Sequence, residues 1–425
     1  MAAERGLMGD DRRRQFGLYL AGLRRRTGKS QRQLAALLCA LSGTASITRN
    51  EVSRWERGGR VPEAWLPFLA AVLHVPEAQL QQAVSYVRGD RLAQLPGAAQ
   101  TLAKLLPPGD PLEPRAARTG RRIGVDTVTG LAGRVHGLRL ADDVLSGGDL
   151  IVPAFRELSA AVTLHRESAY SDDVGRALLV QIGELAQIAG WIASDAGRLE
   201  DAERAYRLGI SAARQAGDGP LVANLAGSLA YQWSNTGREG EGVDLARAAV
   251  DEAGEDAPGK TRALFFDRVA WAHTKMGRTH SQEAMRALGE AHDALTSNEG
   301  AEEPLWAYWV SREELEVMDA RVYTELHRPL RAVPLLADVL DRYDATHARE
   351  LALYRSWLAV ALADANEPEQ AAAEALRVIE LSGDLTSDRT ASRTRVVLER
   401  LREYDDVPEV HTVLAEHGHL LLAES

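Results

Sequence analysis

A repeat in the middle of the chain is the feature that most restricts the possible fold. The dipeptide Gly-Arg occurs at 197–198, 237–238 and 277–278, with a spacing of 40 residues. An aromatic residue lies six positions before each glycine, and a small residue directly precedes each aromatic. Small residues let two helices approach closely, and an aromatic ring fills the space beside them. The repeat therefore predicts antiparallel helix pairs that carry the motifs Gly190-Trp191, Ala230-Tyr231 and Ala270-Trp271.

Two weaker copies of the same unit follow, one centred on His327 and one on Asn366. Residues 130–190 and 390–422 are expected to form flanking or capping helices. In the second helix of the first pair, the amphipathic face is expected to include Ala202, Tyr206 and Gly209. From residue 124 onwards the pattern indicates an all-α array of stacked helix pairs.

Short helices are also predicted for the first 90 residues. Phe16, Leu20 and Leu23 recur at helical spacing in the first of them. Ser30 is a good N-cap for a second helix, with Gln33 at the capping-box position. The buried face of that second helix is expected to contain Leu34, Leu37 and Leu38.

Thr48 can cap a third helix, with Glu51 three residues later. Val52 and Trp55 are expected to point inward, and Gly58-Gly59 to end this helix. A fourth helix is predicted over residues 62–75, with an apolar face that consists of Leu66, Leu69, Val72 and Leu73.

Charge is distributed unevenly along a chain whose net charge is −11. Residues 1–91 contain 15 Lys/Arg against 8 Asp/Glu, residues 92–123 contain 5 against 2, and residues 124–425 contain 30 against 51. A basic head on an acidic body indicates that the head meets a polyanion. The basic runs Arg12–Arg14 and Arg24–Arg26 are expected to be solvated, with some contact to phosphate.

Two segments near the N-terminus resemble the XRE (lambda-repressor/Cro-like) helix-turn-helix family, namely LAGLRRRTGKSQRQLAALL and NEVSRWERGGRVPEAWLPFLAAVLHV. The motif residues are Ser30-Gln31, Leu34-Ala35 and the run VSRWERG at 52–58, and the resemblance covers about 65 residues. The whole arrangement is similar to actinobacterial regulators that join such a head to tetratricopeptide-like repeats. The stretch GRLEDAERAYRLG at 197–209 matches the tetratricopeptide pattern at its glycine, alanine and aromatic positions, although the period exceeds the usual 34 residues.

A proline-rich linker is expected over residues 91–123, because Pro107, Pro108, Pro111 and Pro114 prevent a regular helix. The resemblance implies a helix-turn-helix domain over residues 1–90 and an α-solenoid of tetratricopeptide-like helix pairs over 124–425. It also implies that the third helix enters the major groove of double-stranded DNA. The base-contacting positions are then Arg49, Asn50, Ser53 and Arg54, with Thr48 at the cap, Gln31 against a phosphate and Arg60 near the backbone.

One departure concerns the turn before the third helix. The family has about six residues there, whereas CALSGTASITRNE at 39–51 predicts an extended turn that contains Cys39. The alternative for the whole head is a small helical bundle that binds only protein.

The repeated aromatics have two interpretations. By analogy with tetratricopeptide sensors, Trp191, Tyr231 and Trp271 lie on the first helix of each pair, near a ligand groove. Polar contacts for a ligand would then come from Asn224, Gln232, Arg268, Lys275 and Arg312. The other interpretation is that the aromatics are inter-helix core.

Catalytic and metal-binding patterns are weak. GEDAPGKT at 254–261 satisfies the phosphate-loop pattern, but a helical segment precedes it where a strand is needed, so an inter-helix loop is expected. His411, His417 and His419 are expected to lie on a capping helix rather than in a metal site. We therefore expect no enzyme, no cofactor and no metal. The best apolar run, Trp65–Leu73, is too short for a membrane span.

These observations predict a cytoplasmic transcriptional regulator that forms a homodimer on a palindromic operator. The repeats would dimerise and bind a peptide, a small molecule or a protein effector. The alternative is an interaction scaffold whose repeats recruit a protein while the head docks without specificity.

Overall fold

The fold is taken from a computed structural model, which describes residues 12–14, 16–17, 19–24, 27, 29–88, 102, 105, 112, 120–143, 145, 147–297, 302–342, 348–383 and 388–421. Within these residues the regular structure is helical, and one isolated parallel bridge joins Arg122 and Ala169. The all-α prediction is therefore confirmed. Most of the predicted linker at 91–123, including its four prolines, lies outside the described residues.

Internal contacts divide the chain into two compact units, which are described separately. One consists of residues 1–106 and 244–257, and the other of residues 107–243 and 258–425.

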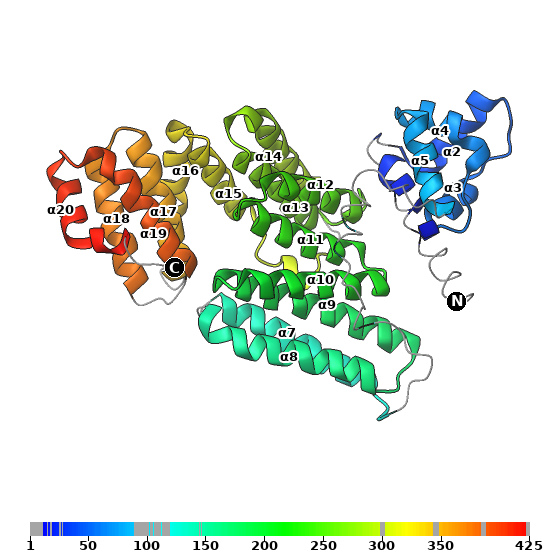
Figure 1. The fold of residues 1–425 in the computed structure, drawn as a ribbon, viewed down its shortest axis with the longest axis horizontal. Coiled ribbons are helices and arrows are strands. Elements are labelled where there is room, and N and C mark those ends of the chain that lie inside the picture. Colours follow the sequence, from blue (N-terminus) through cyan, green and yellow to red (C-terminus); the bar gives the residue numbers. More distant parts are fainter. Residues whose placement is uncertain are drawn as a thin grey trace. The chain divides into compact units, whose positions relative to one another are not determined.

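In the first unit, helical residues 19–24 precede four α-helices: α2 (Gln31–Ser42), α3 (Arg49–Glu56), α4 (Leu66–Leu73) and α5 (Glu77–Arg88) (Figure 1). A short 3₁₀ turn, η1 (Glu63–Trp65), leads into α4. Both predicted N-caps are confirmed. Gln33 N donates to Ser30 Oγ at 3.2 Å while Ser30 N donates to Gln33 Oε1 at 2.8 Å, which completes the capping box. Glu51 N donates to Thr48 Oγ1 at 3.4 Å.

The predicted extended turn is wrong. Helix α2 continues to Ser42 and ends at Gly43, whose φ of 68° lies in the left-handed region that stops a helix. Only residues 43–48 separate α2 from α3, so the additional residues lengthen the helix and not the turn. Cys39 accordingly lies inside α2, half-buried, with its Sγ 3.2 Å from the carbonyl oxygen of Ile47.

A single apolar core holds these helices together. The inward positions predicted for the third and fourth helices are confirmed, as are Phe16, Leu20 and Leu23. The prediction that Leu37 belongs to the buried face of α2 is wrong, because Leu37 is 39% exposed while Ala35 is buried. Burial of this core fixes which face of α3 remains in solvent.

The predicted array belongs to the second unit, except for residues 244–253 of α12, which the internal contacts group with the first unit. Five helix pairs follow one another along the chain: α9 (Asp172–Asp195) and α10 (Leu199–Ala216), α11 (Gly219–Ser234) and α12 (Glu239–Ala253), α13 (Gly259–Lys275) and α14 (Ser281–Thr296), α15 (Arg312–Glu325) and α16 (Pro329–Arg342), and α17 (Ala348–Asp364) and α18 (Pro368–Gly383). Partners pack along each other in the pairs α9–α10, α13–α14, α15–α16 and α17–α18. Figure 1 shows this succession from green to orange.

Flanking helices are present at both ends of the array. Helices α7 (Val125–Asp142) and α8 (Gly147–Glu167) precede the first pair, and α19 (Asp388–Leu401) and α20 (Pro408–His417) follow the last. Short 3₁₀ segments complete the unit: η2 (Arg278–His280), η3 (Leu305–Ala307), η4 (Arg402–Tyr404) and η5 (Gly418–Leu421).

All five predicted repeat centres share a positive φ angle. The residue between the two helices has a positive φ in every pair: 72° at Gly197, 82° at Gly237, 94° at Gly277, 53° at His327 and 63° at Asn366. Glycine adopts this region at no steric cost, and asparagine and histidine tolerate it better than most residues do. The two weaker copies are therefore true members of the array.

Among the described residues, α9 is the one helix long and apolar enough to cross a membrane by length and composition alone. Of its most apolar 18-residue stretch, 61% is buried inside the protein. Isolated polar residues interrupt its sequence, so it contains no long continuous apolar run. A buried core helix of a repeat array has the same length and composition.

Close packing at Gly190 explains why a small residue precedes the aromatic. A Cβ atom built on Gly190 would lie 2.6 Å from the ring of Tyr206, which is fully buried in the second helix of the same pair. The ring that fills the space beside the small residue is thus Tyr206, and Trp191 points elsewhere.

Replacing Gly190 with alanine is expected to destabilise the protein by about 1–3 kcal/mol, because the new methyl group overlaps a ring that has no room to move. Gly133 in α7 is the matched control, since a Cβ there meets nothing within 4 Å. Gly133→Ala is expected to be neutral or slightly stabilising. Urea unfolding of both variants followed by circular dichroism measures the difference, and equal midpoints would contradict the packing argument.

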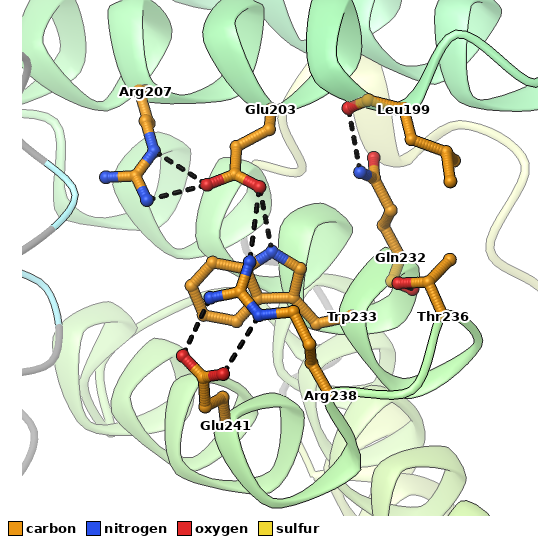
Figure 2. A network of polar contacts seen from close by, with 8 residues as sticks. All are labelled: Leu199, Glu203, Arg207, Gln232, Trp233, Thr236, Arg238 and Glu241. Carbon is orange, nitrogen blue, oxygen red and sulfur yellow. Dashed lines mark hydrogen bonds and ion pairs between the residues drawn. The ribbon is translucent and has the colours of Figure 1, made fainter.

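Glu203 joins the first pair to the second. Its carboxylate accepts hydrogen bonds from Arg207 at 2.6 Å, from Trp233 Nε1 at 3.2 Å and from Arg238 at 3.3 Å, as Figure 2 shows. Arg238 belongs to the second Gly-Arg dipeptide; its guanidinium lies 3.8 Å from the Trp233 ring centroid and also pairs with Glu241. Arg238 therefore binds Glu241 within the second pair and Glu203 of the first pair.

The charge on Glu203 makes this contact dependent on pH. Burial raises the pKa of Glu203, but the hydrogen bonds from Arg207 and Trp233 and the charges of Arg207 and Arg238 outweigh it, so the pKa is lowered overall. A lowered folded-state pKa stabilises the protein above the unfolded-state pKa, and this stability is lost as the pH falls through the folded-state pKa. The substitution Glu203→Gln should therefore lower the free energy of unfolding most at neutral pH. The difference in unfolding free energy from the wild type should shrink in acid, and a difference that does not change with pH would contradict this.

Candidate nucleic-acid interface and a cavity in the repeat array

Helix α3 presents a polar face to solvent. Val52 and Trp55 are buried in the core, whereas Arg49, Asn50 and Arg54 are exposed and Ser53 is half-exposed. This division follows from the helical period, because residues three positions apart share a face. The four predicted base-contacting side chains therefore lie at or near the accessible side of one helix, with Thr48 exposed at its N-cap and Arg60 exposed after its end.

Two ion-pair contacts of α3 differ in strength. Arg54 contacts Glu51 at 3.1 Å, but the arginine side chain is mostly exposed, so this ion pair contributes little to stability. Arg54 can therefore leave Glu51 for another acceptor. Arg24 instead forms a buried bidentate pair with Glu56, with Nε to Oε1 at 2.7 Å and Nη2 to Oε2 at 3.2 Å. The expectation that Arg24 is solvated is therefore wrong.

Gln31 completes this buried network. Its Nε2 donates to Glu56 Oε2 at 2.6 Å, and Arg24 Nη1 donates to the carbonyl oxygen of Lys29 at 2.6 Å. The end of α3 is thereby tied to the start of α2. Glu56 is not among the residues predicted from the sequence, although its position one turn after Val52 and beside Trp55 indicates an inward carboxylate that needs a cation.

The head therefore consists of two capped helices that are joined by a six-residue turn. The second helix carries arginine, asparagine and serine on its solvent-exposed side. This arrangement defines a helix-turn-helix head of the kind found in DNA-binding regulators. Residues 15–83 match the family model of the helix-turn-helix domain. The match covers α2, α3 and α4 and part of α5, and supports a DNA-binding regulator. A search of curated proteins found none that matches this chain.

A cavity of about 560 Å³ lies in the second unit. It is lined mainly from the first helices of the pairs, α9, α11, α13, α15 and α17, with α7, α16 and the segment around η3. Of the predicted groove residues, Trp191, Asn224, Tyr231 and Arg268 line it.

The other four predicted groove residues have different surroundings. Gln232 is buried and its Nε2 donates to the carbonyl oxygen of Leu199 at 2.9 Å (Figure 2). Trp271 is buried and its Nε1 donates to Asn235 Oδ1 at 3.2 Å. Two cations pair with glutamates outside the cavity lining: Lys275 with Glu325 at 3.2 Å and the exposed Arg312 with Glu316 at 3.5 Å.

The repeated aromatics form a continuous row. The ring centroids of Trp191 and Tyr231 are 5.9 Å apart, and those of Tyr231 and Trp271 are also 5.9 Å apart. In the fourth pair the equivalent position, six residues before His327, holds Arg321, which the sequence analysis missed because this copy lacks an aromatic. Trp191 and Tyr231 line the cavity, whereas Trp271 is buried between helices.

The phosphate-loop pattern at 254–261 covers the loop between α12 and α13 and the first three residues of α13, so the expected inter-helix loop accounts for residues 254–258. The backbone amide of Lys260 donates to Glu303 Oε1 at 2.9 Å, and Thr261 Oγ1 lies 3.4 Å from Glu303 Oε2. A carboxylate of the protein thus contacts the start of α13, where the pattern would require a phosphate. Among the described residues, no group of three or more His, Cys, Asp or Glu side chains is arranged to hold a metal ion.

Proposed function

We propose that this protein is a sequence-specific transcriptional regulator that binds double-stranded DNA through α3. The observation that carries the proposal is the exposed face of α3, on which Arg49, Asn50 and Arg54 are accessible while the opposite face is buried. Arginine can bind guanine through two hydrogen bonds, and asparagine can bind adenine in the same way. The resemblance to the XRE family supports the same interpretation.

The rest of the chain fits such a regulator. We assign DNA binding to residues 1–90, the linker to 91–123, and dimerisation and effector binding to the tetratricopeptide-like array at 124–425. One head offers few base contacts, so a homodimer on a palindromic operator would supply the specificity. A reducing cytoplasm suits a chain with a single cysteine.

Fluorescence anisotropy with the purified full-length protein tests the proposal. Binding to the DNA upstream of its own gene is compared with binding to a scrambled sequence across a salt series. We expect a clear preference for the upstream DNA at every salt concentration. Equal binding to both sequences with a steep salt dependence would reflect phosphate attraction alone, and would favour the interaction scaffold.

A further inference from the structure

Three buried arginines line the cavity of the repeat array. Arg139 is 4% exposed and pairs with Glu184 at 2.9 Å. The other two are Arg268, which is 7% exposed, and Arg321, which is 9% exposed. Taking a guanidinium out of water is costly unless acceptors surround it. Arg321 donates from Nη2 to the Tyr231 hydroxyl at 2.7 Å, but its buried Nε has no hydrogen-bond partner among the described residues. Arg321 therefore retains donor capacity next to an open volume.

Aromatic rings hold the guanidinium groups of Arg268 and Arg321 in place. The Cζ atoms of Arg268 and Arg321 lie 4.7 Å and 5.7 Å from the ring centroid of Tyr231. Arg321 also lies 4.5 Å from the Trp271 ring and 5.4 Å from the Trp357 ring. A ring face attracts the positive charge but does not take the place of an oxygen acceptor for the N–H groups. The rings thus pre-position both cations. Arg268 also contacts the buried carboxylate of Asp267 at 3.5 Å, whereas the Nε of Arg321 keeps its capacity to bind a carboxylate.

The remaining cavity wall favours a flat apolar body. The volume of the cavity is in the range usual for small-molecule sites. Six aromatic side chains line it: Trp191, Tyr231, Trp306, Tyr308, Trp309 and Tyr354. Planar rings of a ligand can stack against such a surface in offset or edge-on arrangements.

Carboxylates in the same lining limit the charge of the ligand. The lining contains five carboxylates and four arginines: Asp142, Asp143, Glu313, Glu314 and Glu350, with Arg139, Arg268, Arg321 and Arg342. A ligand with several negative charges would be repelled by these carboxylates, which disfavours polyphosphates and nucleic acid as occupants. One negative charge at Arg321, on an otherwise uncharged molecule, suits both sets of residues.

We propose that the cavity binds a small molecule with a single carboxylate on a planar aromatic body, and that the carboxylate contacts Arg321. This inference names the chemical class of the effector that the repeat array would bind. It rests on the proposed function only in one respect, namely that binding of the effector would regulate DNA binding. Binding itself requires no DNA.

Isothermal titration calorimetry on the full-length protein tests the inference with three carboxylates: benzoate, 2-naphthoate and indole-3-acetate. Each is compared with its neutral amide and with the corresponding primary amine. We expect at least one carboxylate to bind, about tenfold or more tighter than its amide, with no binding of the amine, because a hydrogen-bonded charge pair is lost in both analogues. No binding by any carboxylate, or equal binding of acid and amide, would overturn the inference.

Variants locate the bound carboxylate. Arg321→Gln should weaken carboxylate binding about tenfold or more while amide binding changes less than twofold, whereas the exposed Arg312→Gln, outside the lining, should change neither. Exposed Glu313→Gln at the rim provides a test that does not disturb the buried row. It should tighten binding of 2,6-naphthalenedicarboxylate more than that of 2-naphthoate. An unchanged dicarboxylate affinity would contradict the role assigned to the acidic lining.

The DNA and cavity proposals fail separately. Anisotropy without any carboxylate tests DNA binding, and calorimetry without DNA tests the cavity. Repeating the anisotropy with the tightest carboxylate at saturation then measures coupling between the two. A carboxylate that binds without changing the DNA affinity would leave the cavity assignment standing and overturn its regulatory consequence.

Discussion

Replacing both Arg49 and Asn50 with alanine is expected to weaken binding to the cognate DNA by about 30-fold to 10⁴-fold. Each good bidentate contact to a base contributes roughly 1–3 kcal/mol of discrimination, and every 1.4 kcal/mol corresponds to about a factor of ten. Both side chains are exposed on α3 and contribute nothing to the core, so the head should remain folded. Binding to scrambled DNA should decrease much less.

Arg60→Ala is the matched control for this double variant. Arg60 is exposed just after α3 and is predicted to meet the DNA backbone, which carries no sequence information. Its loss should weaken binding to cognate and scrambled DNA by the same factor and reduce the salt slope by about one. Anisotropy titrations of both variants at several salt concentrations make the comparison. A double variant that loses affinity equally for both DNA sequences would contradict base recognition by α3.

Glu56→Ala is expected to destabilise the head by about 3–5 kcal/mol, since it leaves the Arg24 guanidinium buried without its partner. It also removes the acceptor of Gln31, so the link between α2 and α3 is lost. A loss of this size is a large part of the stability of a typical domain. Hydrogen exchange of the full-length protein should show lost protection over residues 49–59. DNA binding should fall although Glu56 itself is buried away from any DNA.

Two further variants separate this effect from a simple change of charge. Glu51→Gln removes the exposed partner of Arg54 and should cost less than about 1 kcal/mol. The double variant Arg24→Met/Glu56→Leu removes both buried charges and should recover much of the protection lost in Glu56→Ala. If Glu56→Ala were as mild as Glu51→Gln, the buried pair would not hold α3 in place.

Local rules account for what could be predicted from the sequence. The caps at Ser30 and Thr48 and the positive φ at Gly197 depend only on a few neighbouring residues. The two turns that lack glycine, at His327 and Asn366, were located as weaker copies of the repeat. The length of α2 was missed because the residues before Gly43 suit either a helix or a loop, and only packing decides between them.

Long-range contacts could not be predicted. Arg24 and Glu56 are 32 residues apart, and their pairing depends on how the first helix packs against α3. Gln232 was placed in the groove beside Tyr231, but one residue along a helix turns the side chain by about 100°. Arg321 was overlooked because the repeat phase was defined by its aromatic residues, and a cation occupies that phase in the fourth pair.

The cavity also has a consequence for the cooperativity of unfolding. In a repeat array each unit contacts mainly its neighbours, so stability is close to a sum of local contributions and the two ends can melt separately. This cavity is lined by side chains from α7 to α17, which span all five pairs. A single bound molecule would therefore act as a cross-link between pairs that do not adjoin each other. Occupancy would turn a chain of loosely coupled segments into one that melts as a unit.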